Sequence, residues 1–449
     1  MQLAQNKRSR SFLIEFFCRF FALMCDFGHR VSDPSRSAMT IPWARSSPSC
    51  FLSLAFCLSP FVFASLLSTF NCQLSAAFLI GTPNFSHLAV TISKIDHISF
   101  SNRDKFHSLL PANGNGWTRF VSPSGSDSSR GTIAAPWKTL NAAFARLRSG
   151  DTLCLRGGTY PMIVSSGYNQ IFENVSGTAS NPLTVTNYPG EVAIVQGNTR
   201  VQAAYVVFRD TPPAGSGLIF EGPTGQELGL IDIMHSHDVT IDHVEVRGGD
   251  YHAGVYQYGG YNIKLLDSYI HDNGRPGYIN TDQGVYWDMT TGGGNLISNC
   301  VIEHNVSTGI QLYPNTTRVT VEENTIVNNG NYGMEVYGSD DTIVNNIFAD
   351  NGTVANNPQL KISGGGNHFI DSNIFWSPNE KLRGYIEEGT NQKVTHAFSV
   401  DPLFTDPAKH DYHLQAKSPA IGAGNSNYKQ STDRDGVARA KLSLGAYGH

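Results

Sequence analysis

Residues 309–351, GIQLYPNTTRVTVEENTIVNNGNYGMEVYGSDDTIVNNIFADN, contain two passes of one pattern. Each pass opens with a glycine and a short apolar strand, crosses a polar turn to a second apolar run, and ends on a third run that closes in asparagine. The opening glycines, Gly309 and Gly333, are 24 residues apart. Short strands that recur with this period predict a solenoid in which each coil stacks on the one before.

The same register continues on both sides of this stretch. Further passes open at Gly254, Gly284 and Gln359. Alternation along each strand directs one apolar residue per coil inward, and these residues are Val255, Val285, Ile310, Met334 and Leu360. Asparagine recurs at two corners, where stacked amides can hydrogen-bond between coils; the two sets are Asn273, Asn305, Asn329, Asn351 and Asn324, Asn346, Asn373. The pattern predicts an all-β chain that forms a parallel β-helix with three strands per coil.

Both ends of the repeat have distinct sequences. Residues 139–148 form an amphipathic pattern typical of a short helix, with Leu140, Ala143, Phe144 and Leu147 on one face. A solenoid must cover the open end of its core, so we expect residues 117–160 to form an N-terminal cap that includes this helix. Residues 401–449 lose the period, and we expect them to form a C-terminal closing segment of the domain 117–449.

The first 116 residues do not continue the pattern. An apolar run at residues 50–70 follows Arg45 and precedes small residues, which is the order of a secretory signal. We therefore expect residues 1–77 to be a leader whose true start is Met39, and residues 78–116 to be a linker or disordered. A single-pass membrane anchor is the alternative. The first hypothesis predicts a secreted protein with no membrane segment in its mature form.

Composition narrows the partners of the folded part. The net charge is −5 and only 15% of residues are charged, without a run of Lys or Arg, which argues against a nucleic-acid partner. Only Cys154 and Cys300 lie in the β-helix, and their apolar surroundings predict buried free thiols rather than a disulfide framework. We expect a monomer.

Four short motifs resemble one family. FVSPSGSD at residues 120–127, PWKT at 136–139, RGGTY at 156–160 and DPLF at 401–404 are similar to the entry and the ending of pectate-lyase-like right-handed parallel β-helix proteins. The resemblance covers about residues 117–449. It implies a right-handed β-helix and a superfamily of polysaccharide lyases, glycoside hydrolases, uronate epimerases and non-catalytic members. The chain lacks the dense Asp-Asp and Lys arrangement of the calcium-dependent pectate lyases.

The outward positions of the first strand of each coil form a candidate sugar-binding face. Exposed tyrosines on a rigid sheet offer sugar rings an apolar face and a hydroxyl, although tyrosine is also common in strands without any function. The substrate-binding candidates are Tyr256, Tyr258, Tyr286, Tyr313 and Tyr337.

Acidic and basic residues around this face suggest chemistry. A lyase that breaks a uronate chain by β-elimination needs a base and a cation. The candidates for the base are Arg275, Lys361 and Lys264. Asp250, Asp272 and Asp282 are the candidate ligands of a Ca²⁺ ion. A hydrolase would instead use paired carboxylates such as Asp288 and Glu335. Lys361 and Glu335 also fit a simple salt bridge. The leading hypothesis is a lyase that acts on a uronate-containing polysaccharide, and the alternatives are a hydrolase and a non-catalytic glycan-binding protein.

Overall fold

The computed structural model describes residues 118–161, 170–173, 175–210, 217–225 and 229–448. The predicted leader, the candidate start at Met39 and the predicted linker lie outside these residues. Within the described ranges, no helix is long and apolar enough to cross a membrane.

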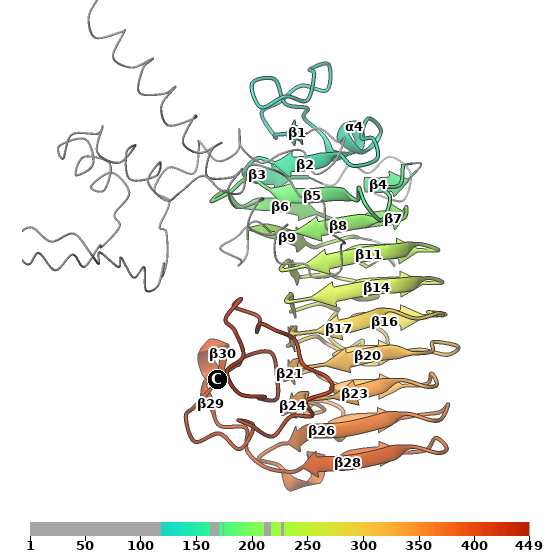
Figure 1. The fold of residues 1–449 in the computed structure, drawn as a ribbon, viewed down its shortest axis with the longest axis vertical. Helices are drawn as coiled ribbons and strands as arrows, with labels where there is room; N and C mark the ends of the chain where they lie inside the picture. Colours follow the sequence, from blue (N-terminus) through green and yellow to red (C-terminus); the bar gives the residue numbers. More distant parts are fainter. Residues whose placement is uncertain (1–117, 162–169, 174, 211–216, 226–228, 449) are drawn as a thin grey trace, which may run out of the picture. The chain divides into compact units, whose positions relative to one another are not determined.

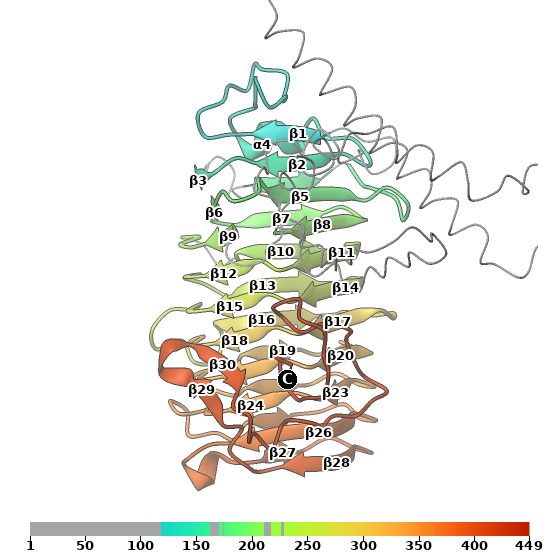
Figure 2. The ribbon, with the colours of Figure 1, turned by 60° about the vertical axis from the view of Figure 1, so that its left-hand side comes forward.

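The described residues form a parallel β-helix with three faces (Figures 1 and 2). Successive strands belong to different faces, and each strand pairs in parallel with the equivalent strand of the next coil. The first face is a nine-stranded sheet of β4 (Gln170–Glu173), β7 (Thr199–Gln202), β10 (Ile231–Met234), β13 (Ala253–Tyr258), β16 (Gln283–Asp288), β19 (Ile310–Leu312), β22 (Met334–Val336), β25 (Leu360–Ile362) and β27 (Tyr385–Glu387).

The second and third faces join into one sheet of 19 strands. The second face contains β1 (Thr118–Val121), β2 (Thr152–Leu155), β5 (Leu183–Asn187), β8 (Val206–Arg209), β11 (His237–Asp242), β14 (Tyr261–Leu266), β17 (Asn295–Ser298), β20 (Val319–Glu322), β23 (Thr342–Val344), β26 (Phe369–Trp376) and β28 (Lys393–Phe398). The third face contains β3 (Gly158–Tyr160), β6 (Ala193–Gln196), β9 (Leu218–Glu221), β12 (Glu245–Arg247), β15 (Tyr269–His271), β18 (Val301–Glu303), β21 (Thr325–Val327) and β24 (Ile347–Ala349). β26 turns the corner and pairs with both β23 and β24.

The core follows the predicted register. The five inward residues pair coil to coil and have no exposed side-chain surface; they are Val255, Val285, Ile310, Met334 and Leu360. Cys154 and Cys300 are buried free thiols, as expected. The sequence period therefore identified the residues that fill the interior.

The asparagine ladders form, with one difference in backbone geometry. Asn305 Nδ2 donates to Asn329 Oδ1 at 2.9 Å, and Asn329 Nδ2 donates to Asn351 Oδ1 at 2.9 Å. The residues in left-handed backbone conformation are those directly before the ladder asparagines, such as His304 and Asn328 at φ 50° and 55°. The ladder position therefore selects an amide for its hydrogen bonds, and the preceding position turns the chain.

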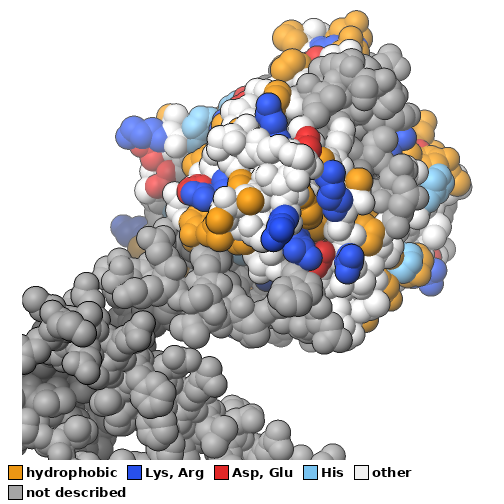
Figure 3. All heavy atoms as spheres, turned by 90° about the horizontal axis from the view of Figure 1, so that it is seen from above, with side chains coloured by type: hydrophobic (Ala, Val, Ile, Leu, Met, Phe, Trp, Pro, Cys, Tyr) orange, Lys and Arg blue, Asp and Glu red, His pale blue; other side chains and the backbone are white. Residues whose placement is uncertain are grey.

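The helix near the N-terminal end of the described residues is shorter than the pattern indicated. α4 spans Leu140–Phe144, and Thr139 caps it by accepting from the Ala142 N–H. Leu140, Ala143 and Phe144 are buried in the same cluster as the first coils. Viewed onto this end, Lys and Arg side chains are prominent on the surface (Figure 3).

The C-terminal residues return along the outside of the β-helix. After β28, the strands β29 (Phe404–Asp406) and β30 (Asp411–Leu414) form an antiparallel hairpin, joined by the 3-10 helix η3 (Pro407–Lys409). Figures 1 and 2 both show this segment beside β21 and β24 of the third face. Its apolar side chains pack on outward residues of that face, for example Tyr412 and Leu444 in one cluster with Val301 and Ile347. The return segment, residues 401–448, thus covers a side of the solenoid.

Candidate functional site

Four predicted tyrosines form a continuous column on the first face. Tyr256 and Tyr286 stack with ring centroids 5.3 Å apart, Tyr286 and Tyr313 are 5.8 Å apart, and Tyr313 and Tyr337 are 5.1 Å apart. Tyr256 and Tyr286 are paired in register, whereas Tyr313 and Tyr337 directly follow β19 and β22, so the ring contacts cross from one register position to the neighbouring one. We call these four residues the tyrosine column. Tyr258 lies beside it and packs edge-on against His235.

Glu335 lies on β22, two residues before Tyr337 at the end of the tyrosine column. Both oxygens of its carboxylate accept hydrogen bonds. Gln311 Nε2 donates to one oxygen at 2.9 Å, while the hydroxyls of Tyr337 and Ser363 donate to the other at 3.0 and 2.8 Å. Its side chain is only 8% exposed. A carboxylate with this many partners is suited to holding its neighbours in position.

Lys361 lies one coil further along, in register with Glu335. Its Nζ is 3.8 Å from Glu335 Oε1 and 3.7 Å from Glu388 Oε2, and the side chain is 22% exposed. The salt bridge with Glu335 that the sequence suggested is therefore present. Both ion pairs are long, so the ammonium group is loosely held at the end of the tyrosine column.

Asp288 occupies the upper part of the same face. It pairs in register with Tyr258 and is half-buried. Burial raises the pKa of its carboxyl above the usual value. Burial also raises the pKa of Tyr256 to about 12, with a further contribution from the charge of Asp288. Asp288 and Glu335 both belong to this face, two coils apart, as the strand register predicted.

Arg275 and Asp282 bind each other within the long loop between β15 and β16. The guanidinium donates from Nε and Nη2 to the two carboxylate oxygens at 2.8 and 2.9 Å, and the Arg275 backbone N–H donates at 2.9 Å. The guanidinium also lies 3.9 Å from the Tyr251 ring centre and 3.7 Å from that of Tyr278. The hydrogen bond with Asp282 raises the pKa of Arg275 further, so this arrangement does not favour Arg275 as a proton acceptor.

The three acidic residues predicted to hold calcium have separate partners. Asp250 accepts from the N–H and hydroxyl of Thr224 at 2.6 and 2.8 Å, Asp272 accepts from His271 at 2.7 Å, and Asp282 is bound by Arg275. Among the described residues, the groups whose ligating atoms converge are Glu303, His304, His410 and Asp242, His243, Asp267. The predicted trio does not fit a shared Ca²⁺ ion.

Asp232 is a further acidic residue of the first face, which the sequence analysis did not identify. It precedes Tyr256 by one coil in the same register and follows Arg200. Its side chain is buried, which raises the pKa of the carboxyl to about 7. Alternation within Ile231–Met234 would have revealed this outward acid if the register had been extended one coil toward the N-terminus.

Comparisons with known proteins agree with the fold. Residues 119–344 match the family model described as "Pel9A-like, right handed beta helix region". The chain is 28% identical over 254 residues to the uncharacterized protein YwoF of Bacillus subtilis, covering 53% of this chain and 47% of that protein. It is 29% identical over 206 residues to pectate lyase PEL9 of Emericella nidulans, covering 43% of this chain and 49% of that protein. The chain thus spans about half the length of these relatives.

A solved structure shows the same architecture. The crystal structure of pectate lyase Pel9A superimposes with a TM-score of 0.50 at 15% sequence identity, covering 74% of this chain and 96% of that one. At this identity the similarity establishes the fold alone.

Proposed function

The chain belongs to the Pel9A-like right-handed β-helix family, and on that premise we propose that it is a secreted polysaccharide lyase that cleaves a uronate-containing chain by β-elimination. The observation that supports this most directly is the continuous tyrosine column with Lys361 at its end. The homologues and the fold support a carbohydrate-active protein. The substrate, the reaction and secretion are parts of the proposal.

The tyrosine column provides the binding surface. Its rings follow one another across four coils, and coils are spaced by about 4.8 Å. An extended polysaccharide can run along Tyr256, Tyr286, Tyr313 and Tyr337 and contact the accessible ring edges and hydroxyls, while Tyr256 and Tyr286 stack on each other. The rigid sheet keeps these contacts in place without ordering a loop.

Lys361 is the proposed base. β-Elimination requires a group that removes the proton beside the uronate carboxylate. Among the candidates, Arg275 is bound on both sides by Asp282 and two tyrosine rings, whereas Lys361 is partly exposed at the column. A sugar docked on Tyr337 would remove water from around Nζ, so that the amine could meet the proton beside the uronate carboxylate directly.

The proposed mechanism assigns no step to calcium, because Asp250, Asp272 and Asp282 bind other groups. The assay nevertheless varies the calcium concentration. The pectate lyases among the relatives make calcium dependence worth measuring.

The decisive experiment incubates the expressed chain with polygalacturonate, alginate and glycosaminoglycans, with calcium and then with chelator. Lyase activity produces unsaturated uronates, which are followed by ultraviolet absorbance. Lys361→Ala should abolish the rise, whereas Lys264→Ala, an outward lysine of β14 on the second face, should leave it unchanged. Activity that survives in Lys361→Ala would refute Lys361 as base.

A non-catalytic glycan-binding protein is the second candidate. Two observations favour it. Glu335 already accepts hydrogen bonds from its neighbours on both carboxylate oxygens. Asp250, Asp272 and Asp282 each bind a different group of the protein, so these carboxylates stabilise the fold. Binding without unsaturated products or new reducing ends would support this function. New reducing ends without ultraviolet absorbance would indicate a hydrolase.

A further inference from the structure

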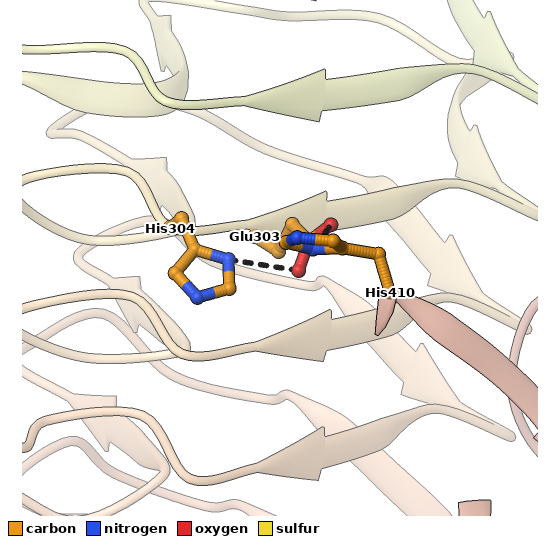
Figure 4. A group of neighbouring side chains, drawn as sticks. All are labelled: Glu303, His304 and His410. Atoms are coloured by element: carbon orange, nitrogen blue, oxygen red, sulfur yellow. Dashed lines mark hydrogen bonds and ion pairs between the residues drawn. The ribbon is translucent and has the colours of Figure 1, made fainter. Parts of the chain in front are cut away.

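A second cluster of ionisable side chains lies on the third face, away from the tyrosine column. β18 ends at Glu303, His304 follows it directly, and His410 lies between η3 and β30 in the return segment. His304 Nδ1 is 2.8 Å from Glu303 Oε2, and His410 Nδ1 is 2.9 Å from Glu303 Oε1. Figure 4 shows the two rings converging on the carboxylate from different parts of the chain.

The three side chains differ in burial in a way that suits a bound ion. Glu303 has no exposed side-chain surface, while His304 and His410 are 39% and 52% exposed. The carboxylate therefore forms the floor of the cluster and the imidazoles form its rim, so an ion can enter from solvent.

Two tyrosines hold the carboxylate from behind. The hydroxyls of Tyr269 and Tyr412 both donate to Glu303. These two hydrogen bonds set the orientation of the Glu303 carboxylate, as outer partners usually do for carboxylates that ligate metals.

The geometry is compatible with a single small cation. The ligating atoms of Glu303, His304 and His410 all lie within 4.8 Å of one another. Two ligands of one tetrahedral zinc ion are separated by about 3.3 Å, given metal–ligand distances of about 2.0–2.1 Å. Shifts of a few tenths of an ångström at the two short contacts would therefore admit the ion, with water as a fourth ligand.

Position 304 turns the chain at this corner. The equivalent positions in neighbouring coils are Asp272, Asn328 and Asp350, all with left-handed backbone. Histidine tolerates this conformation as Asp and Asn do, so the backbone admits His304 without strain. The feature that sets this coil apart is the arrival of His410 beside the turn.

We propose that Glu303, His304 and His410 bind one zinc ion, which fastens the return segment to the β18 coil. The ligand set of two imidazoles and a carboxylate with an open position is one that zinc accepts. The ion would join residues 107 positions apart and so stabilise the packing of Tyr412 and Leu414 on the third face.

The test uses the full chain after chelator treatment, titrated with zinc chloride by calorimetry and followed by thermal unfolding. We expect one ion per chain with a micromolar or tighter dissociation constant, and a melting temperature about 2–4 °C higher with excess zinc. His304→Gln and His410→Gln retain an amide donor for Glu303 but lose the imidazole nitrogen, and each should weaken zinc binding at least about tenfold.

His413→Gln is the matched control, because His413 lies in the same segment, is 48% exposed and also bonds to carboxylates. It should bind zinc as the wild type does. The proposal is overturned if no stoichiometric zinc binding occurs, if both cluster variants bind normally, or if His413→Gln weakens binding as much as they do. Should His410→Gln unfold without metal, His304→Gln decides, because its backbone belongs to the coil rather than to the return segment.

Discussion

Arg275 and Asp282 form a two-pronged ion pair that closes the loop between β15 and β16, at 2.8 and 2.9 Å. Asp282 is fully buried on its side chain, and the Arg275 guanidinium lies between the rings of Tyr251 and Tyr278. The loop beside the proposed sugar-binding face is therefore held by a charge pair with planar, stacked geometry.

Replacing Arg275 with alanine should destabilise the fold, because it leaves the Asp282 carboxylate buried without its cation. We expect a loss of about 1–3 kcal/mol in the free energy of unfolding, less than for a fully buried pair because the guanidinium is 23% exposed. Arg275→Lys should recover only part of it, since lysine lacks the planar fork. Denaturant unfolding measures this. Unchanged stability with complete loss of lyase activity would instead support Arg275 as the base.

Truncating the tyrosine column should weaken polysaccharide binding. Tyr313 is 38% exposed and contacts both Tyr286 and Tyr337, so Tyr313→Ala removes the centre of the surface. An aromatic contact of about 1.4 kcal/mol corresponds to a roughly tenfold weaker dissociation constant. Affinity electrophoresis in gels containing polysaccharide measures the change. Tyr261→Ala is the control, because Tyr261 is 46% exposed on the second face; equal effects of the two variants would contradict the assignment.

Removing one amide from the asparagine ladder should lower the free energy of unfolding. Asn329 Nδ2 donates to Asn351 Oδ1 and to the carbonyl of Ile302 at 2.9 and 3.0 Å, and Asn329 Oδ1 accepts from Asn305. Asn329→Ala leaves these buried groups without partners, and we expect a loss of about 2–4 kcal/mol in the free energy of unfolding. Equilibrium unfolding in urea measures it. The outward residue Thr320 is the control, since Thr320→Ala should change stability by less than about 0.5 kcal/mol.

The buried Asp341 should make stability depend on pH. Burial raises its pKa to about 8, from 3.8 for a free aspartate, while its carboxylate lies 3.5 Å from the buried His368. Unfolding thus releases a proton between these two pH values, and the free energy of unfolding falls as the pH rises toward 8. Burial lowers the pKa of His368, so well above pH 6.5 this residue is neutral in both states and adds no slope.

Asp341→Asn should remove this slope. The amide can still accept from the Val319 N–H as Asp341 does at 2.9 Å, and Asn295 already makes the equivalent bond to Ile263. We expect the variant to be more stable than the wild type at pH 8, by an amount on the order of 1–2 kcal/mol, and closer to it at pH 6.5. Unfolding curves at the two pH values test this. Parallel pH profiles for the two proteins would show that Asp341 ionises normally.

Sequence alone determined the repeating part of this protein. The spacing of Gly309 and Gly333 identified the coil, alternation identified inward residues such as Val285, and the ladder position of Asn329 followed from its period. The tyrosines and the pairing of Lys361 with Glu335 followed from the same register. The physical reason is that parallel pairing converts a difference of one period in sequence into a fixed step of about 4.8 Å in space.

Contacts that lie outside the period were decided only by the tertiary structure. The clustering of Asp250, Asp272 and Asp282 along the chain predicts a shared calcium ion, yet each of the three carboxylates binds another group that sequence spacing does not identify. His410 belongs to no coil, so its position against Glu303 depends on the path of the return segment and on the apolar packing that holds it. The contacts of side chains in loops and terminal segments depend on such three-dimensional packing, which the spacing of the repeat does not predict.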